Sequence, residues 1–265
     1  MTNAALTDLD VATVEQHLRK LGVKLGAPVS VVDETGSTNE DALKAGAAGA
    51  AHGALFVADQ QRAGRGRLGR TWHSPPGQNL YFSLLLRPRT EASSLASMTL
   101  VVGLAVAEAV GRFLPAGLVG IKWPNDVVIG GRKLAGILVE ASTTRGRVDH
   151  VVVGVGLNVL QTQFAPEIEE IATSIEREAG VGPGRLEVLG AVLERLDARL
   201  ATFDEAGVAP MIEELRAYDV LRGRELRVGE VEGTGDGIDE AGRLLVRTES
   251  GEVVAVNAGE VSLVR

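Results

Sequence analysis

The sequence predicts an α+β fold: a large mixed α/β domain with a central mixed sheet, followed by a small C-terminal β-barrel. Up to residue 220, short apolar runs typical of strands alternate with segments whose apolar residues recur at helical spacing. After Leu221 the pattern changes to short β-like runs separated by Gly, Asp and Glu turns, which is typical of small barrels. We therefore expect two domains, over residues 1–220 and 221–265.

The helices are predicted from apolar periodicity and from capping signals. Val11, Val14, Leu18 and Leu21 recur at helical spacing and predict a first amphipathic helix. Ser37 with Glu40 three residues later matches a capping box, so a second helix should begin there. Apolar periodicity predicts further helices over residues 95–113, 185–206 and 210–218.

The strands are predicted from short apolar runs bounded by turn residues. In the large domain they cover residues 29–33, 54–58, 80–86, 119–122, 127–129, 134–140 and 150–155. In the barrel they cover residues 225–228, 244–247 and 253–256. Gly130-Gly131 predicts a hairpin turn. Residues 60–78 are rich in Gly, Arg and Pro and are expected to form a long loop.

The composition excludes several classes of protein. The chain has 265 residues, 45% of them hydrophobic, and no cysteine, so it can bury a core but has no disulfide framework and no thiolate zinc site. Its net charge of −8 argues against broad nucleic-acid binding. The N-terminus lacks the pattern of a signal peptide, and no stretch approaches the ~18 apolar residues of a membrane span. A cytoplasmic protein is expected.

The charge is unevenly distributed. Residues 60–90 contain no acidic residue but carry Arg62, Arg65, Arg67, Arg70, Arg87 and Arg89. A cationic segment in an acidic chain predicts a site for a small anion, and a solvated loop is the alternative.

The densest motif in this segment is Gly-Arg-Gly-Arg-Leu-Gly-Arg-Thr at residues 64–71. It fits both G-x-G-x-x-G and a P-loop with Arg in place of Lys, but both folds require a helix directly after the loop. Trp-His-Ser-Pro-Pro-Gly at 72–77 cannot begin that helix, which excludes both folds. Glycines allow close backbone approach and arginines bind anions, so we expect an anion-binding loop that is mobile until a ligand arrives.

Three further motifs lie at strand ends. Lys-Trp-Pro-Asn-Asp (122–126) places a cation, an amide and a carboxylate together, and Asp126 could hold Mg²⁺. Arg-Lys-Leu-Ala-Gly-Ile-Leu-Val-Glu (132–140) begins with cations and continues as an apolar strand. Gly-Val-Gly-Leu-Asn (154–158) leaves room for a flat ligand. Taken singly, each is equally consistent with a structural turn, a hairpin arm or a buried glycine crossing.

Together with Thr-Gly-Ser-Thr-Asn (35–39), these motifs resemble the biotin–protein ligase family in content and in order. Ala-Thr-Ser (172–174) and the ending Gly-Glu-Val-Ser-Leu (259–263) also look like the family. The resemblance covers roughly residues 30–265. It implies a mixed-sheet catalytic domain, an SH3-like C-terminal barrel, and an enzyme that activates biotin with ATP and Mg²⁺ and transfers it to a lysine of a biotin carboxyl carrier protein.

The resemblance also implies roles for individual residues. Catalytic roles fall to Arg65, Arg67, Lys122 and Lys133. Biotin contacts fall to Ser37, Thr38, Asn39, Gln61, Gly64, Arg65, Gly66, Arg67, Lys133, Gly136, Leu138 and Gly156. ATP contacts fall to Arg70, Trp72, Lys122, Asn125 and Asn158, with Trp72 stacking on adenine and Asn158 bonding its edge. Asp126 would hold the metal.

Some members of the family carry an N-terminal DNA-binding module of roughly 60 residues. Here about 30 residues precede Val31 and hold one clear helix, so the short form without that module is expected, as a monomer or weak homodimer that binds neither DNA nor membrane. Three rival interpretations are a lipoate–protein ligase, a DNA-binding regulator that responds to biotin, and a non-catalytic binding module.

Overall fold

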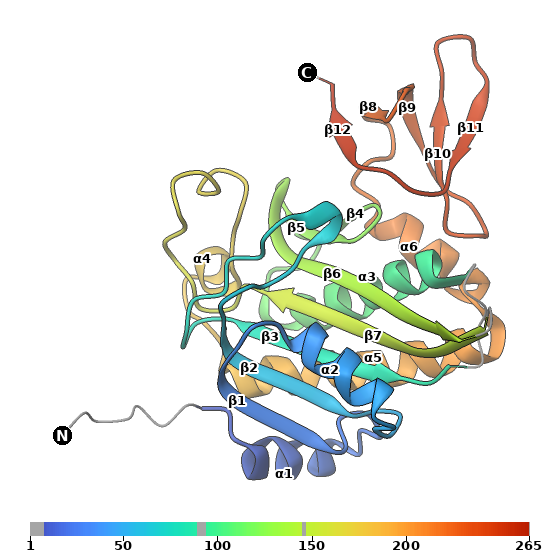
Figure 1. Ribbon diagram of the computed structural model, residues 1–265. Helices are drawn as coiled ribbons and strands as arrows, with labels where there is room; N and C mark the ends of the chain where they lie inside the picture. The colour runs from blue at the N-terminus through green and yellow to red at the C-terminus, as the bar shows by residue number, and fades with distance from the viewer. Residues whose placement is uncertain (1–7, 89–93, 145–146, 265) are drawn as a thin grey trace.

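A seven-stranded mixed sheet forms the centre of the larger part of the molecule (Figure 1). The computed structural model describes residues 8–88, 94–144 and 147–264, so the first seven residues and Arg89 of the cationic run lie outside it. The strands lie in the order β1-β2-β3-β7-β6-β5-β4, and only the β1–β2 pair is parallel among these neighbours. Their bounds are β1 Val29–Thr35, β2 Leu55–Gln61, β3 Leu80–Leu86, β4 Val119–Lys122, β5 Asp126–Ile129, β6 Arg132–Thr144 and β7 Arg147–Leu157.

All seven predicted strands are confirmed. β6 and β7 are longer than predicted because they pair with each other along almost their whole length, which extends both beyond their apolar centres. Register also separates the two faces of β7. Val153 and Val155 belong to the main hydrophobic core, whereas Gly154 and Gly156 alternate with them and lie on the opposite face.

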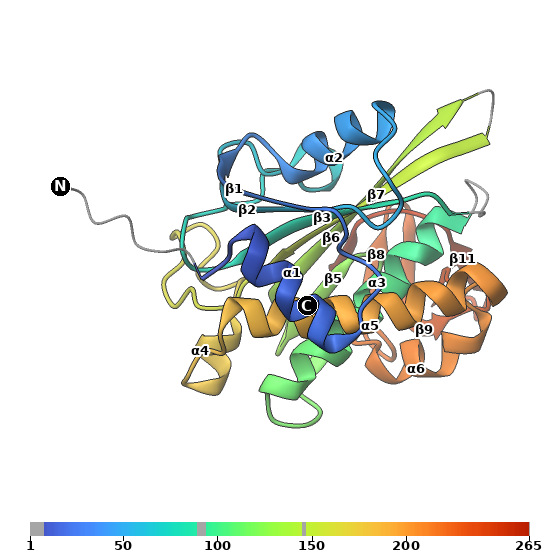
Figure 2. The same cartoon turned by 90° about the horizontal axis from the view of Figure 1, so that it is seen from below.

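The helices cover the two faces of the sheet unequally (Figure 2). α2 lies on one face, and α1, α3 and α5 lie on the other, where the main core is found. α2 packs on its face around Ala42, Leu85 and Val152, and Asn39 in its first turn lies against Gly154. The bounds are α1 Val11–Leu21, α2 Thr38–Ala47, α3 Leu95–Val110, α4 Ile175–Ala179, α5 Arg185–Ala206 and α6 Ile212–Tyr218, with 3-10 turns η1 Arg67–Gly69, η3 Gly111–Phe113 and η4 Ala209–Met211.

The predicted helices are confirmed, and the short helix α4 was not predicted. One expectation about them was wrong: the segment Leu95–Phe113 is long and apolar enough to cross a membrane, judged by length and composition over the described residues. In the structure 67% of it is buried. A helix that is apolar on all sides is typical of a position between two layers, and α3 lies between the sheet and α5.

The C-terminal part is a five-stranded antiparallel sheet that forms a separate lobe (Figure 1). Its order is β11-β10-β9-β8-β12, with bounds β8 Glu225–Val228, β9 Val231–Ile238, β10 Leu244–Arg247, β11 Val253–Val256 and β12 Val261–Leu263. β9 was not predicted from the sequence, because Gly233, Gly235 and Gly237 interrupt its apolar pattern.

The predicted C-terminal β domain is confirmed as an antiparallel sheet. No closed barrel is found among the described residues, where β11 and β12 are the two edge strands. Residues 257–260, which join these strands, do not continue the sheet. Instead, Gly259 and Glu260 reach toward the larger part of the molecule, where they contact Arg67 and Arg70.

The two parts are held together beside the Lys-Trp-Pro-Asn-Asp motif. The indole Nε1 of Trp123, which is 2% exposed, donates a 3.1 Å hydrogen bond to the carbonyl oxygen of Gly242 in the β9–β10 turn. Gly242 adopts a φ of +79°, and a Cβ there would approach Ser97 and Leu100 of α3 to 3.1–3.2 Å. Thus the turn fits between Trp123 and α3 and fixes where residues 259–260 lie.

Candidate active site

The floor of the site is made by glycines of β6 and β7. Gly136 lies opposite Gly156 in the antiparallel register, and Leu138 lies opposite Gly154. A Cβ at Gly154 would lie 2.0 Å from the side-chain oxygen of Asn39, and one at Gly156 would lie 2.5 Å from the indole of Trp72. Because these positions lack side chains, polar and aromatic groups can lie directly on the sheet.

Above this floor is a groove of about 190 Å³. Its walls come from the start of α2, the loop after β2, the β4–β5 turn and residues 259–261 of the C-terminal part. The predicted site residues that line it are Ser37, Thr38, Asn39, Gln61, Arg65, Gly66, Arg67, Arg70, Trp72, Lys122, Asn125, Asp126, Lys133, Gly136, Leu138 and Gly156. Chain segments far apart in sequence thus meet at one place.

Two predicted residues do not line the groove. Asn158 is 5% exposed, and its side-chain amide donates a 2.9 Å hydrogen bond to the carbonyl oxygen of Thr173, which supports the segment after β7. Gly64 shapes the loop: its carbonyl accepts from Trp72 N at 2.8 Å, and a Cβ would lie 2.5 Å from the carbonyl oxygen of Trp72.

The start of α2 differs from the predicted capping box. Ser37 is the N-cap residue, but within the described residues its hydroxyl makes no capping hydrogen bond. Gln61 takes over part of this function, because its Oε1 accepts from Thr38 N at 3.0 Å. The Ser37 hydroxyl is therefore left at the groove, where a ligand can use it.

A chain of hydrogen bonds runs along the floor. Buried Ser83 of β3 donates to Asn39 Oδ1 at 2.6 Å and lies 2.8 Å from Thr38 Oγ1. Thr38 contacts Gln61, whose Nε2 donates to Ser74 Oγ at 3.0 Å. This chain fixes the orientation of each polar group, so the site is organised before a ligand binds.

In the structure the Gly-Arg loop is held by several hydrogen bonds and ion pairs. Gly66 N donates to the carbonyl of Arg70 at 2.7 Å, which closes a tight turn. Arg65 pairs with Glu140 of β6 at 2.6 Å, and Arg70 pairs with Glu260. Arg67 donates to Asn125 Oδ1 at 3.0 Å and to the carbonyl of Gly259 at 3.4 Å. These contacts hold both limbs of the loop over the sheet.

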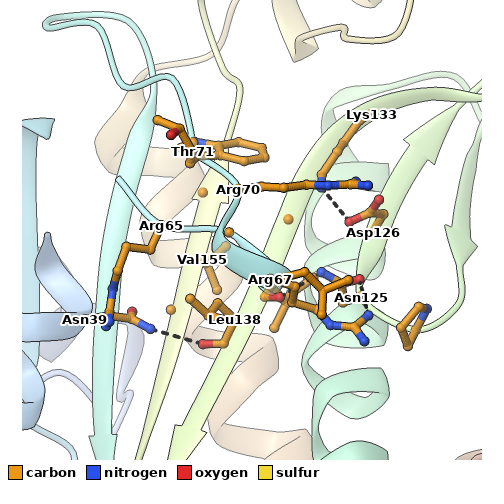
Figure 3. Close-up of a pocket in the computed structure, with 18 of the residues that line it drawn as sticks. Asn39, Arg65, Arg67, Arg70, Thr71, Asn125, Asp126, Lys133, Leu138 and Val155 are labelled. Carbon is orange, nitrogen blue, oxygen red and sulfur yellow. Dashed lines mark hydrogen bonds and ion pairs between the residues drawn. The ribbon is translucent and has the colours of Figure 1, made fainter. Parts of the chain in front are cut away.

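Cationic groups surround the groove (Figure 3). Arg65 lies beside Asn39 on one side, whereas Arg67, Arg70 and Lys133 lie on the other. Lys133 Nζ is 2.6 Å from Asp126 Oδ1. Chiefly through its hydrogen bond to Arg70, with further contributions from Lys122 and Arg67, the pKa of Glu260 is held below its usual range.

Trp72 lies across the two glycines of the floor. A Cβ on Gly136 or Gly156 would come within 3.0 Å of the ring, and Lys133 Nζ is 5.3 Å from the ring centroid. The buried indole N–H has no hydrogen-bond partner within the described residues. The ring thus offers both an aromatic face and a free donor.

The donor set does not form a metal site by itself. Within the described residues no three His, Asp, Glu or Cys side chains are grouped as metal ligands, and Asp126 is already paired with Lys133. Mg²⁺ is commonly held by one or two carboxylates together with substrate phosphates. The site therefore fits a metal that arrives with a phosphate ligand and not a resident ion.

Sequence reasoning missed several groups that position the site. Glu140 and Ser83 hold Asn39 from below, and Glu260 holds Arg70 from the C-terminal part. A signal for Ser83 existed, because it is the polar residue within the buried run Leu80–Leu86. Glu140 and Glu260 lay within quoted motifs, but nothing in their spacing indicated that arginines 75 and 190 residues away would contact them.

Comparisons with known proteins match both parts of the chain. The family model described as Biotin/lipoate A/B protein ligase family matches residues 31–158, and the model described as Biotin protein ligase C terminal domain matches residues 224–264. A biotin–[acetyl-CoA-carboxylase] ligase of Paracoccus denitrificans is 39% identical and covers 86% of this chain and 97% of its own length.

Two further relatives extend the likeness. The bifunctional ligase/repressor BirA of Bacillus subtilis is 35% identical over 83% of this chain and 69% of its own length. The structure of a biotin protein ligase from Aquifex aeolicus in complex with biotin and ATP superposes with a TM-score of 0.80, at 35% identity, over 90% of this chain and 99% of that one.

Proposed function

Because the chain belongs to the biotin protein ligase family and is a ligase, we propose that its groove activates biotin with ATP and transfers the biotinyl group to a protein lysine. The observation that carries this proposal is the groove itself. A polar floor that is organised in advance adjoins a set of cations held by one loop and two strands. Such a site suits a ligand with a neutral polar end and an anionic end.

The first step joins two anions, the carboxylate of biotin and the α-phosphate of ATP. We propose that Arg67, Lys122 and Lys133, with Arg65 and Arg70 beside them, offset this repulsion and stabilise the charge that develops on the phosphorus. A carboxylate oxygen attacks the α-phosphorus, pyrophosphate leaves, and biotinyl-5′-AMP forms. Asp126 would be the protein carboxylate that faces a Mg²⁺ ion carried by ATP, and such an ion would supply further neutralisation of the phosphate charge.

Biotinyl-5′-AMP is a mixed anhydride, which water hydrolyses. The loop with its contacts to Glu140, Asn125 and Glu260 forms a cover on the groove, and excluding water is a recognised function of such covers. The neutral amine of the acceptor lysine then attacks the carbonyl carbon and AMP leaves. Since a free lysine has a pKa of about 10.4, the ammonium must lose a proton before it can attack.

The wider assignments belong to the same proposal. We assign residues 1–220 to the biotin- and ATP-binding domain and residues 221–265 to an SH3-like C-terminal domain. The relatives are named for acetyl-CoA carboxylase, which supports a biotin carboxyl carrier domain as the acceptor. A monomer or weak homodimer in the cytoplasm, with no DNA or membrane partner, completes the proposal.

Mass spectrometry after incubation with biotin, MgATP and a biotin carboxyl carrier domain tests it. The carrier should gain the mass of one biotinyl group at one lysine. Lys122→Met should abolish the gain, and Lys20→Met on the exposed face of α1 should not. A carrier that stays unmodified by the native enzyme would refute the proposal.

A further inference from the structure

The cations of the groove differ in whether a carboxylate neutralises them. Arg65 pairs with Glu140, Arg70 with Glu260, and Lys133 with Asp126. Within the described residues neither Arg67 nor Lys122 has a carboxylate within ion-pair distance. Both act at longer range on Glu260, but that carboxylate is already paired with Arg70. In the part of the chain that the structure describes, the guanidinium of Arg67 donates to neutral oxygens, the side-chain carbonyl of Asn125 and the backbone carbonyl of Gly259.

Glu140 does more than accept one guanidinium. Its Oε2 accepts from Arg65 Nη2 at 2.6 Å and from Asn39 Nδ2 at 2.8 Å, and its side chain is 27% exposed. It follows Gly136 and Leu138 on the same face of β6, at the end of the groove away from Asp126. Glu140 therefore fixes one wall of the groove through two residues from different elements.

The Nε of Arg65 adds a second observation. This buried donor has no hydrogen-bond partner within the described residues, although the guanidinium itself is held by Glu140. A guanidinium whose charge is cancelled and whose N–H is free is suited to a neutral acceptor, whereas a phosphate or carboxylate is drawn to a cation that has no counter-charge.

We propose that Glu140 is a positioning residue that fixes and neutralises Arg65, so that Arg67 and Lys122 carry the charge that meets the anionic reactants. The proposal rests on the proposed function and refines it in one respect. Arg65 is no longer one of the cations that neutralise the reactants but a structural part of the groove wall. Arg65 and Glu140 then form one unit, and the anion-binding end lies beside the β4–β5 turn.

The test uses a double variant that leaves the net charge of the groove unchanged. Inorganic pyrophosphate, titrated by calorimetry without biotin, is the probe. Arg65→Met with Glu140→Gln removes the pair together, so pyrophosphate affinity should stay within about threefold of the native value, because the field of a close ion pair largely cancels. Arg67→Met should weaken pyrophosphate about tenfold or more, because it removes an uncompensated charge.

The single variant Glu140→Gln gives an independent readout. Its amide oxygen can still accept from Asn39, so the fold is retained, but Arg65 now carries an uncompensated charge. Pyrophosphate should bind about threefold more tightly, while kcat falls because Arg65 is no longer held in place. Glu194→Gln is the matched control, since it removes a carboxylate from an ion pair with Arg112 on the helical side of the molecule.

Two outcomes overturn the proposal: a double variant that loses as much pyrophosphate affinity as Arg67→Met, or Glu140→Gln binding no more tightly than Glu194→Gln. The first result would mean that Arg65 meets the anion directly, and the second that Glu140 does not offset the charge of Arg65 at the anion. The pyrophosphate titration contains no biotin, so it tests the role of Glu140 separately from the proposed function. If the proposed function were wrong, the native enzyme would still bind pyrophosphate but would not react with biotin.

Discussion

Gly156 shows how one missing side chain can decide the shape of a site. The Trp72 ring lies where a Cβ on Gly156 would be, at 2.5 Å, and the floor glycine Gly136 is almost as close at 3.0 Å. From sequence, these glycines could be predicted to leave room for a flat group. That the group in this structure is a tryptophan of the same chain could not be predicted, because the contact joins residues from a loop and a distant strand.

Gly156→Ala should therefore displace Trp72 without unfolding the protein. The new methyl group must push the ring away from the sheet, so ATP should bind more weakly, by about 1–3 kcal/mol if the ring stacks on a base. Calorimetry with ATP measures the effect, and Gly184→Ala at the start of α5, where a Cβ would meet nothing within 4 Å, serves as a glycine control outside the groove. Unchanged ATP binding by Gly156→Ala would show that the position of the ring does not matter to the nucleotide.

Asp219, at the junction between α6 and β8, gives a prediction about pH. Burial raises its pKa, although Leu221 N donates to its Oδ1 at 2.8 Å. The folded state therefore holds the proton more tightly than the unfolded state, and this group adds stability as the pH falls from neutral toward 3.8. Asp219→Asn should be the more stable protein at pH 7, and its advantage should shrink in acid. Urea unfolding at pH 7 and pH 5 measures this, and an advantage independent of pH would contradict it.

At the scale of elements, predictions from local patterns succeeded and those that depended on distant partners failed. β3, β4 and α5 begin and end where their apolar patterns do. Among the described residues the capping hydrogen bond predicted for Ser37 is not formed, because Gln61 at the end of β2 accepts the hydrogen bond from the N–H of Thr38. The contacts of the Gly-Arg loop could not be predicted for a similar reason: its arginines contact partners 75 and 190 residues away.

The solvent exposure of the Arg70–Glu260 ion pair indicates how much it stabilises the Gly-Arg loop. Arg70 and Glu260 have exposed side chains, and exposed ion pairs contribute about 0–1 kcal/mol, so Glu260→Gln should loosen the loop only modestly. Trypsin cleavage after Arg67 or Arg70 should become about two- to fivefold faster, because losing the free energy of this ion pair makes the open loop more populated by about that factor. Adding biotin and MgATP should slow cleavage in both proteins. A variant cleaved no faster than the native chain would show that this pair does not hold the loop.

On the scale of the whole molecule, the C-terminal sheet supplies a wall of the site. Gly259 and Glu260 lie in the groove, and the turn at Gly242 holds the sheet through Trp123. From sequence, a small β domain could be predicted, but neither its open sheet nor its contact with the groove could. Both depend on packing between segments 119 and 192 residues apart, and local patterns carry no information about such packing.

Trp123→Phe tests this coupling between the two parts. It removes the N–H that bonds the Gly242 carbonyl and leaves a buried acceptor unpaired, which should lower the free energy of unfolding by about 1–3 kcal/mol. Trp72→Phe is the matched control, since the N–H of Trp72 has no partner within the described residues and should cost less in stability. Urea unfolding compares the two, and equal losses would show that the hydrogen bond to Gly242 does not hold the sheet.

The central claim is that the groove forms an acyl-adenylate from biotin. Exchange of labelled pyrophosphate into ATP measures this step directly, without the acceptor protein. Exchange should require biotin and should not occur with lipoate in its place, and Arg67→Met should reduce it strongly while Glu194→Gln leaves it unchanged. Exchange that depends on lipoate but not on biotin, or that proceeds equally with neither, would contradict the assignment.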